Sequence, residues 1–217
     1  MTPGNRRLAV LLSGGGTTMV NLQERIRSGV LPAEIAVVVS SRDDAPGLER
    51  AAGLGLETRV LSRRGFGRGD TFDAAGYSTA LADLLAPFAP GLLVLAGFMT
   101  RLAAPILSRW PAVNVHPALL PGFGGAGFYG HRVHEAVLAA GVKLTGATVH
   151  FVDADYDRGP IITQEAVAVL EDDTAETLAS RVQAAERRIY PAAISLVVSG
   201  RVAVEGRRAR IMPEAGR

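Results

Sequence analysis

The 217-residue chain contains no cysteine, a single lysine (Lys143) and few aromatic residues, 6% of the total. Without cysteine it cannot form disulfides, zinc–thiolate sites, iron–sulfur clusters or a thiol nucleophile. The net charge is only +2, and the scattered arginines do not form the basic, aromatic-rich stripe of a nucleic-acid-binding domain. No apolar run approaches the ~20 residues of a membrane-spanning helix, and the polar N-terminus has no signal-peptide core. We therefore expect a cytoplasmic protein that binds neither nucleic acid nor membrane.

The composition, 48% hydrophobic and 20% charged, is that of a globular protein, and the length predicts a single domain, residues 1–217. Short apolar runs alternate with helical patterns over the first two-thirds of the chain. The expected strands are Leu8–Leu12, Ile35–Val39, Thr58–Leu61, Leu92–Ala96 and Val113–His116, and the expected helices are Met19–Arg27, Gly47–Ala52, Asp73–Leu85 and Ala104–Arg109. This alternation predicts an α/β fold, an open and mostly parallel twisted sheet with helices on both faces.

The pattern changes after His116. The expected elements are a Gly-rich loop (Pro117–Gly130), a helix (His131–Ala140), two strands (Leu144–Val152 and Ile161–Leu170), a long helix from Thr174 and an edge strand (Val202–Val204). Because no helix separates the two long strands, they predict an antiparallel C-terminal extension of the sheet. Pro191 should bend or interrupt the long helix, and the tail 206–217 should be mobile.

A glycine-rich turn, Ser13-Gly-Gly-Gly-Thr-Thr18, follows the first strand and precedes a helix. Glycines allow close approach of the backbone, and a helix N-terminus presents free N–H groups and a positive dipole end. The turn is therefore a candidate phosphate site, although no lysine follows the glycines as in a Walker A loop. A tight strand-to-helix turn without a ligand is the alternative.

Polar side chains also gather where later strands end. Asn114 and His116 lie on one face of a strand, roughly 6–7 Å apart, and Asp157 follows in an Asp-rich loop, Asp153–Pro160. The loop does not fit a calcium-binding loop, because its sixth residue is Arg158 and not glycine. The four histidines lack the HExxH spacing, so we expect no metal. Since ligands of open parallel sheets bind at the carboxyl ends of the strands, these residues predict group transfer to a phosphorylated substrate.

Five motifs occur together in the order Ser13-Gly-Gly-Gly-Thr-Thr, Leu95-Ala-Gly-Phe-Met, Asn114-Val-His-Pro-Ala-Leu-Leu-Pro121, Thr145-Gly-Ala-Thr-Val-His-Phe-Val152 and Asp157-Arg-Gly-Pro-Ile-Ile162. With them the chain resembles the family of folate-dependent phosphoribosylglycinamide formyltransferases from about Arg7 to Val204. The resemblance implies a Rossmann-like formyltransferase fold, with a phosphate-binding half at about 1–100 and a folate-binding, catalytic half at about 101–205.

The resemblance also implies an activity: transfer of the formyl group of 10-formyltetrahydrofolate, a cosubstrate, to the amine of N1-(5-phospho-D-ribosyl)glycinamide in purine (IMP) biosynthesis. The residues that match the family's functional positions fall into three groups. The catalytic residues are Asn114, His116 and Asp157; the substrate-binding residues are Gly16, Thr17, Thr18 and Glu186; the folate-binding residues are Arg68, Met99, Thr100, Arg101, Leu102 and Asn114. In that mechanism Asn114 and a protonated His116 stabilise the oxyanion, and the neighbouring Asp157 favours the charged imidazole.

The chain departs from the family at three places. The family often has Asn within the glycine-rich turn, where this chain has Gly15 and Thr18. The folate-contacting arginine of the family would fall on Gly69, so Arg68 is expected to take its role, and the segment Gly122–Gly130 is longer and richer in glycine than the common form. The implied partners are small-molecule substrates, and a homodimer is a candidate assembly. The alternatives are a 10-formyltetrahydrofolate hydrolase that uses the same three residues with water, and a non-catalytic nucleotide-binding module.

Overall fold

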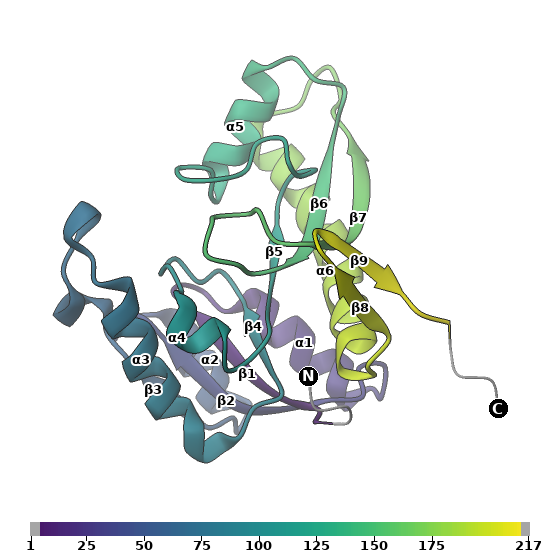
Figure 1. Ribbon diagram of the computed structural model, residues 1–217. Coiled ribbons are helices and arrows are strands. Elements are labelled where there is room, and N and C mark those ends of the chain that lie inside the picture. Colours follow the sequence, from purple (N-terminus) through teal and green to yellow (C-terminus); the bar gives the residue numbers. More distant parts are fainter. Residues whose placement is uncertain (1–4, 214–217) are drawn as a thin grey trace. The chain divides into compact units, whose positions relative to one another are not determined.

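Two compact units make up the computed structural model, which describes residues 5–213 (Figure 1). The first unit runs to Val113 and includes Val198–Gly200, and the second comprises Asn114–Val197 and the residues from Arg201. The boundary lies inside strand β5 (Ala112–His116), later in the chain than the division expected near residue 100.

The first unit is built on four parallel strands in the order β3-β2-β1-β4. Its elements are β1 (Arg7–Leu12), α1 (Thr17–Arg27), β2 (Glu34–Ser40), α2 (Pro46–Gly53), β3 (Thr58–Val60), the 3-10 turns η1 (Arg63–Phe66), η2 (Gly69–Thr71) and η3 (Ala86–Phe88), α3 (Ala74–Leu85), β4 (Leu92–Leu95) and α4 (Ala104–Leu107). The central position of β1 explains its sequence, because Leu8–Leu12 are all fully buried and a strand covered on both faces needs a continuous apolar run.

Helices cover both faces of this sheet, as the alternation of strands and helices predicts. In Figure 1, α3 and α4 lie together on one face, and α1 and α2 lie together on the other. The predicted strands and helices of this region are all present, with bounds that differ by a few residues at most. The predicted fold class, a mostly parallel sheet with an antiparallel C-terminal part, is confirmed.

The second unit contains the antiparallel pair β6 (Leu144–Phe151) and β7 (Ile161–Ala168), which follow the helix α5 (His131–Ala139). β6 is buried along almost its whole length, whereas Gln164, Ala166 and Ala168 of β7 are exposed and the residues between them are half-buried. This difference places β6 inside the unit and β7 with one face towards solvent, as their continuous and alternating sequence patterns indicate.

Pro191 does not interrupt the long helix α6, which runs from Ala175 to Val198 and contains it. The expected interruption was therefore wrong, whereas the expected bend at Pro191 stays a prediction. A buried stripe runs along the helix at residues 178, 182, 185, 189 and 193, so apolar packing continues on both sides of the proline. That packing outweighs the local penalty of about 3 kcal/mol for a proline inside a helix.

The tail from Gly206, which the sequence predicted to be mobile, contains a further strand. β8 (Val202–Glu205) and β9 (Arg208–Ile211) form an antiparallel hairpin, and β9 lies parallel to β7 through the pair Ile161 and Arg208. A two-stranded hairpin is marginal alone, and pairing with the edge strand β7 gives it a partner. Residues 214–217 of the expected tail lie outside the described residues.

None of the helices within residues 5–213 combines the length and the apolarity that crossing a bilayer requires.

Gly146 tests the close packing of β6 against β7. A methyl group at this position would overlap the carbonyl oxygen of Glu165 on β7 and approach Leu119 Cδ2 to 2.8 Å. We expect Gly146→Ala to lower the free energy of unfolding by about 1–3 kcal/mol, as overpacking does. Urea unfolding monitored by circular dichroism measures the change.

Gly53→Ala is the matched control for this substitution. Gly53 ends α2, and no atom lies within 4 Å of the added methyl group. The alanine should leave stability unchanged or raise it by up to about 1 kcal/mol. Equal unfolding midpoints for the two variants would refute the tight packing at Gly146.

Candidate active site

The side chain of His116 lies between two oxygen atoms at the end of β5. The residue is buried, its Nδ1 atom is 3.5 Å from Asp157 Oδ2, and its Nε2 atom is 2.8 Å from the carbonyl oxygen of Phe123. A carbonyl oxygen only accepts hydrogen bonds, so the hydrogen of the neutral imidazole is on Nε2. The Phe123 carbonyl oxygen therefore holds the ring by a hydrogen bond, and Asp157 faces the unprotonated Nδ1 atom on the other side of it.

Both partners of His116 have left-handed backbone conformations, which are uncommon for residues other than glycine. The φ angle is 55° at Asp157 and 51° at Phe123. Such conformations persist only where the surrounding structure enforces them, and they gather at functional sites. Here Gly125 contributes, because its N–H donates to Asp157 Oδ2 over 2.9 Å and joins the two loops.

His150 connects Asn114 to Asp157, a role that sequence reasoning missed. Its Nδ1 atom donates to the carbonyl oxygen of Phe151 over 2.8 Å, which leaves the lone pair of a neutral ring on Nε2. Nε2 lies 3.4 Å from Asn114 Nδ2 and 3.6 Å from Asp157 Oδ1. His150 thus orients the Asn114 amide while one amide N–H stays available. The signal was in the motif that ends β6, where we had considered His150 only as a metal ligand.

The protonation of the pair differs from the expectation. Burial lowers the pKa of His116 below its ordinary value and outweighs the raising effect of the Asp157 charge. Burial alone would raise the pKa of Asp157, but the adjacent His150 imidazole, the charge of His116 and the Gly125 N–H together lower it. At neutral pH a carboxylate therefore faces a neutral imidazole, and the expected charged form of His116 is not the resting form.

A buried hydroxyl holds the loop that follows His116. Thr148 Oγ1 on β6 donates to the carbonyl oxygen of Ala118 over 2.7 Å and accepts from Leu120 N over 3.0 Å. Gln164 Nε2 on β7 donates to the same hydroxyl and to the carbonyl oxygen of Leu120, both over 2.9 Å. With one donated and two accepted bonds the hydroxyl is saturated, so the sheet determines the path of this loop.

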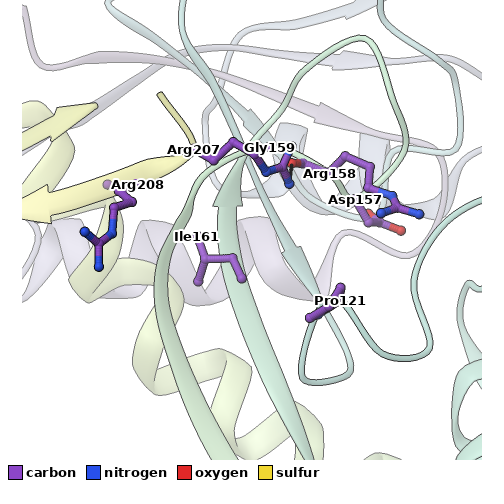
Figure 2. Close-up of a pocket in the computed structure, with 8 residues that line it drawn as sticks. Pro121, Asp157, Arg158, Gly159, Ile161, Arg207 and Arg208 are labelled. Carbon is purple, nitrogen blue, oxygen red and sulfur yellow. Dashed lines mark hydrogen bonds between the residues drawn. The ribbon is translucent and has the colours of Figure 1, made fainter. Parts of the chain in front are cut away.

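The C-terminal hairpin supports the loop that carries Asp157. The Arg207 guanidinium donates to the carbonyl oxygen of Arg158 over 2.7 Å. In Figure 2, Arg207 reaches the loop from the hairpin, and the side chains of Asp157 and Arg158 point to the same side of it. A hollow of about 370 Å³ is lined there by Pro121, Asp157, Arg158, Gly159, Ile161, Arg207, Arg208 and Ala209.

The predicted phosphate-binding residues Gly16, Thr17 and Thr18 form the start of α1 in the first unit. Gly16 has a φ angle of 74°, and a methyl group on it would come within 2.9 Å of Gly47 Cα in α2. Glycine is therefore required at this position. Within the described residues no side chain caps α1, and its first turn carries no acidic residue, which leaves its N–H groups suited to an anion. Arg50 Nη1 donates to the Gly15 carbonyl oxygen over 2.7 Å and brings a positive charge to the turn.

The predicted folate-binding residues other than Asn114 are also in the first unit. Along the segment Met99–Leu102, Met99 and Arg101 are exposed whereas Thr100 and Leu102 are buried. Thr100 Oγ1 is buried and has no hydrogen-bond partner within residues 5–213. Arg68 lies in the loop before η2, with its backbone bonded to Thr71.

Glu186 lies on α6 in the second unit. Burial raises the pKa of its carboxyl group to about 7, with the charge of Arg187 acting in the opposite direction. The group can therefore both donate and accept hydrogen bonds near neutral pH. Within residues 5–213 no hydrogen bond joins it to Asn114, His116 or Asp157. The structure thus brings the three predicted catalytic residues together, through His150, and leaves Glu186 apart from them.

Within the same range no three histidine or acidic side chains gather in an arrangement that would hold a metal ion.

Comparison with known proteins identifies the class to which the chain belongs. Residues 6–194 match the formyl transferase family, and the chain belongs to it. It is similar to the phosphoribosylglycinamide formyltransferase of Haemophilus influenzae, with 33% identity over 97% of this chain and 98% of that protein. The resemblance that the sequence motifs indicated is therefore confirmed.

Two further relatives agree. The crystal structure of glycinamide ribonucleotide transformylase 1 from Symbiobacterium toebii has a TM-score of 0.86 and 42% identity, covering 95% of this chain and 94% of that one. The trifunctional purine biosynthetic protein adenosine-3 of Bos taurus is 42% identical over 92% of this chain. This chain spans only 19% of the length of that relative.

The pKa of His116 should respond to the charge of Asp157. Because that charge raises the pKa and burial lowers it, we expect Asp157→Asn to move the His116 titration to still lower pH. Asp155→Asn removes an exposed carboxylate from the same loop and should leave the titration in place. Histidine C–H chemical shifts followed by NMR between about pH 4 and 9 measure both. An unchanged or higher His116 pKa in Asp157→Asn would show that the two groups are not coupled.

Proposed function

We propose that the protein transfers the formyl group of 10-formyltetrahydrofolate to the amine of N1-(5-phospho-D-ribosyl)glycinamide. The products are the formylated ribonucleotide, an intermediate of purine biosynthesis, and tetrahydrofolate. The observation that carries the proposal is the contact of His116 with Asp157, beside Asn114, in a chain of the formyl transferase family. Similarity to phosphoribosylglycinamide formyltransferases along nearly their whole length supports the choice of substrate.

The attack of the amine on the formyl carbon places negative charge on the formyl oxygen. Asn114 can donate its free amide N–H to that oxygen, because His150 engages only the other. The neutral His116 has its N–H on Nε2, where the Phe123 carbonyl oxygen accepts it in this state. His116 therefore exchanges that carbonyl for the formyl oxygen when it stabilises the oxyanion. Donors of this kind contribute about 3–4 kcal/mol each to the transition state.

Formyl transfer moves one proton from the attacking nitrogen to the leaving nitrogen of the folate. The lowered pKa of Asp157 keeps it a carboxylate at neutral pH, so it can accept the proton that the attacking nitrogen must lose. Nδ1 of His116 faces the same carboxylate, which lets the pair carry the proton to the leaving nitrogen. The amine loses one proton and the folate gains one, so none is consumed overall. General acid–base catalysis of this kind contributes about 10²–10⁴-fold.

The binding roles follow the predicted assignment. Gly16, Thr17 and Thr18 take the substrate phosphate at the N-terminus of α1, where N–H groups and the helix dipole favour an anion. Glu186 contacts the ribose hydroxyls as a donor and acceptor. Arg68, Asn114 and Met99–Leu102 contact the folate. The enzyme acts in the cytoplasm on small molecules, without nucleic acid or metal, and a homodimer is its candidate assembly.

One assay tests the reaction. The protein is incubated with 10-formyltetrahydrofolate, with and without the glycinamide ribonucleotide, and the loss of the formyl group is followed. We expect loss only when the ribonucleotide is present. Loss without it would indicate a hydrolase, and no loss in either mixture would indicate a nucleotide-binding module.

Variants of the cluster test the mechanism. Asn114→Ala should reduce kcat about 10²–10³-fold, because one oxyanion donor is removed, and Asp157→Asn should reduce it about 10²–10⁴-fold. KM should change little in Asp157→Asn. Asp155→Asn, a control that leaves the cluster intact, should keep the wild-type kcat. Near-normal turnover of Asp157→Asn would contradict its role as the proton acceptor.

A further inference from the structure

Ser13 joins the two substrate-binding segments of the first unit through its buried side chain. It directly precedes the glycine turn that leads to Gly16–Thr18, and it contacts the segment that begins Met99–Leu102. We infer that Ser13 is a positioning residue, which sets the place of the bound ribonucleotide relative to the bound folate. The inference rests on the proposed function, because that function supplies the two ligands.

Ser13 makes two hydrogen bonds to the segment at Met99. Its backbone N–H donates to the carbonyl oxygen of Gly97 over 3.1 Å, and its Oγ atom accepts from the N–H of Met99 over 2.8 Å. The two bonds hold the segment at both ends of residues 97–99. The side chain is nearly inaccessible, 6% exposed, so water does not compete for these bonds.

The hydroxyl of Ser13 is also hydrogen-bonded to a third loop. Ser13 Oγ lies 2.6 Å from Ser41 Oγ, and Ser41 is 1% exposed. Ser41 follows β2, Ser13 follows β1 and Gly97 follows β4, and β1 lies between the other two strands. The three loops therefore leave the same edge of the parallel sheet, the edge at which ligands of such sheets bind. Ser13 is the residue at which they meet.

This arrangement predicts an effect on the chemical step more than on binding. The groups that contact each substrate stay in place when the Ser13 hydroxyl is removed, so each substrate can still bind. The Met99 N–H loses its acceptor, however, and the two segments are free to shift relative to each other. Small errors in the alignment of reacting atoms reduce the rate strongly, because transfer requires the amine close to the formyl carbon.

Ser13→Ala tests the inference, with Ser41→Ala as the matched control. Both variants lose the Ser13–Ser41 bond, but only Ser13→Ala loses the acceptor of Met99 N–H. We expect Ser13→Ala to reduce kcat at least tenfold, with each KM within about threefold of wild type. Ser41→Ala should stay within threefold in kcat and in both KM values. Dissociation constants of each substrate, measured separately by calorimetry, should be near those of wild type in both variants.

The outcomes separate the two proposals. A wild-type protein that transfers no formyl group overturns the proposed function. Transfer by wild type with an equal kcat in Ser13→Ala, or an equal loss in Ser41→Ala, overturns the positioning role alone. A loss confined to one KM would assign Ser13 to one binding site instead. If Ser13→Ala does not fold, Ser13→Cys replaces it; its thiol is a weak acceptor of similar size, and an unchanged kcat would overturn the role.

Discussion

The structure of the second unit depends on the carboxylate of Asp157, which is largely buried and still ionised at neutral pH. Burying the Asp157 side chain is unfavourable unless hydrogen bonds and nearby charge compensate, and the N–H of Gly125 in the loop after β5 donates a hydrogen bond to it. His116 at the end of β5 and His150 near the end of β6 also lie against the carboxylate, at 3.5 and 3.6 Å. The carboxylate thereby fixes those segments relative to one another. The same contacts place the imidazole and the Asn114 amide where the proposed mechanism requires them, so they serve both stability and the proposed chemistry.

In the first unit, a few polar groups satisfy the loops that meet at one edge of the parallel sheet. Parallel strands bring several loops to one edge, and each loop must satisfy its own backbone groups. Ser13 satisfies a backbone N–H of one neighbouring loop and a side chain of another. Glycine at position 16 allows α2 to approach the turn, which leaves the start of α1 uncapped and suited to an anion. The close packing of α2 and the proposed anion site at the start of α1 therefore both depend on glycine at position 16.

Much of the fold and part of the candidate site could be predicted from the sequence. The same physical reasons explain which predictions were wrong. The continuous apolar run at Leu8–Leu12 predicts a central strand, and alternation places Asn114 and His116 on one face. Local patterns do not reveal long-range packing, however. The buried stripe that carries α6 through Pro191, and the edge of β7 that orders β9, both depend on residues far apart in the chain. The neutral state of His116 depends on burial, which no spacing shows, and the role of His150 depends on the left-handed backbone that turns Asp157 towards it.

The bond from Arg207 to the loop of Asp157 makes the end of the chain part of the scaffold around the reactive groups. A lesion confined to the β8–β9 hairpin would touch none of the proposed catalytic side chains, yet it would release the carbonyl of Arg158, one residue from the critical carboxylate. Shortened or differently spliced forms of such a chain would therefore be impaired without any change in their signature motifs. An inventory of those motifs alone would misjudge them as intact.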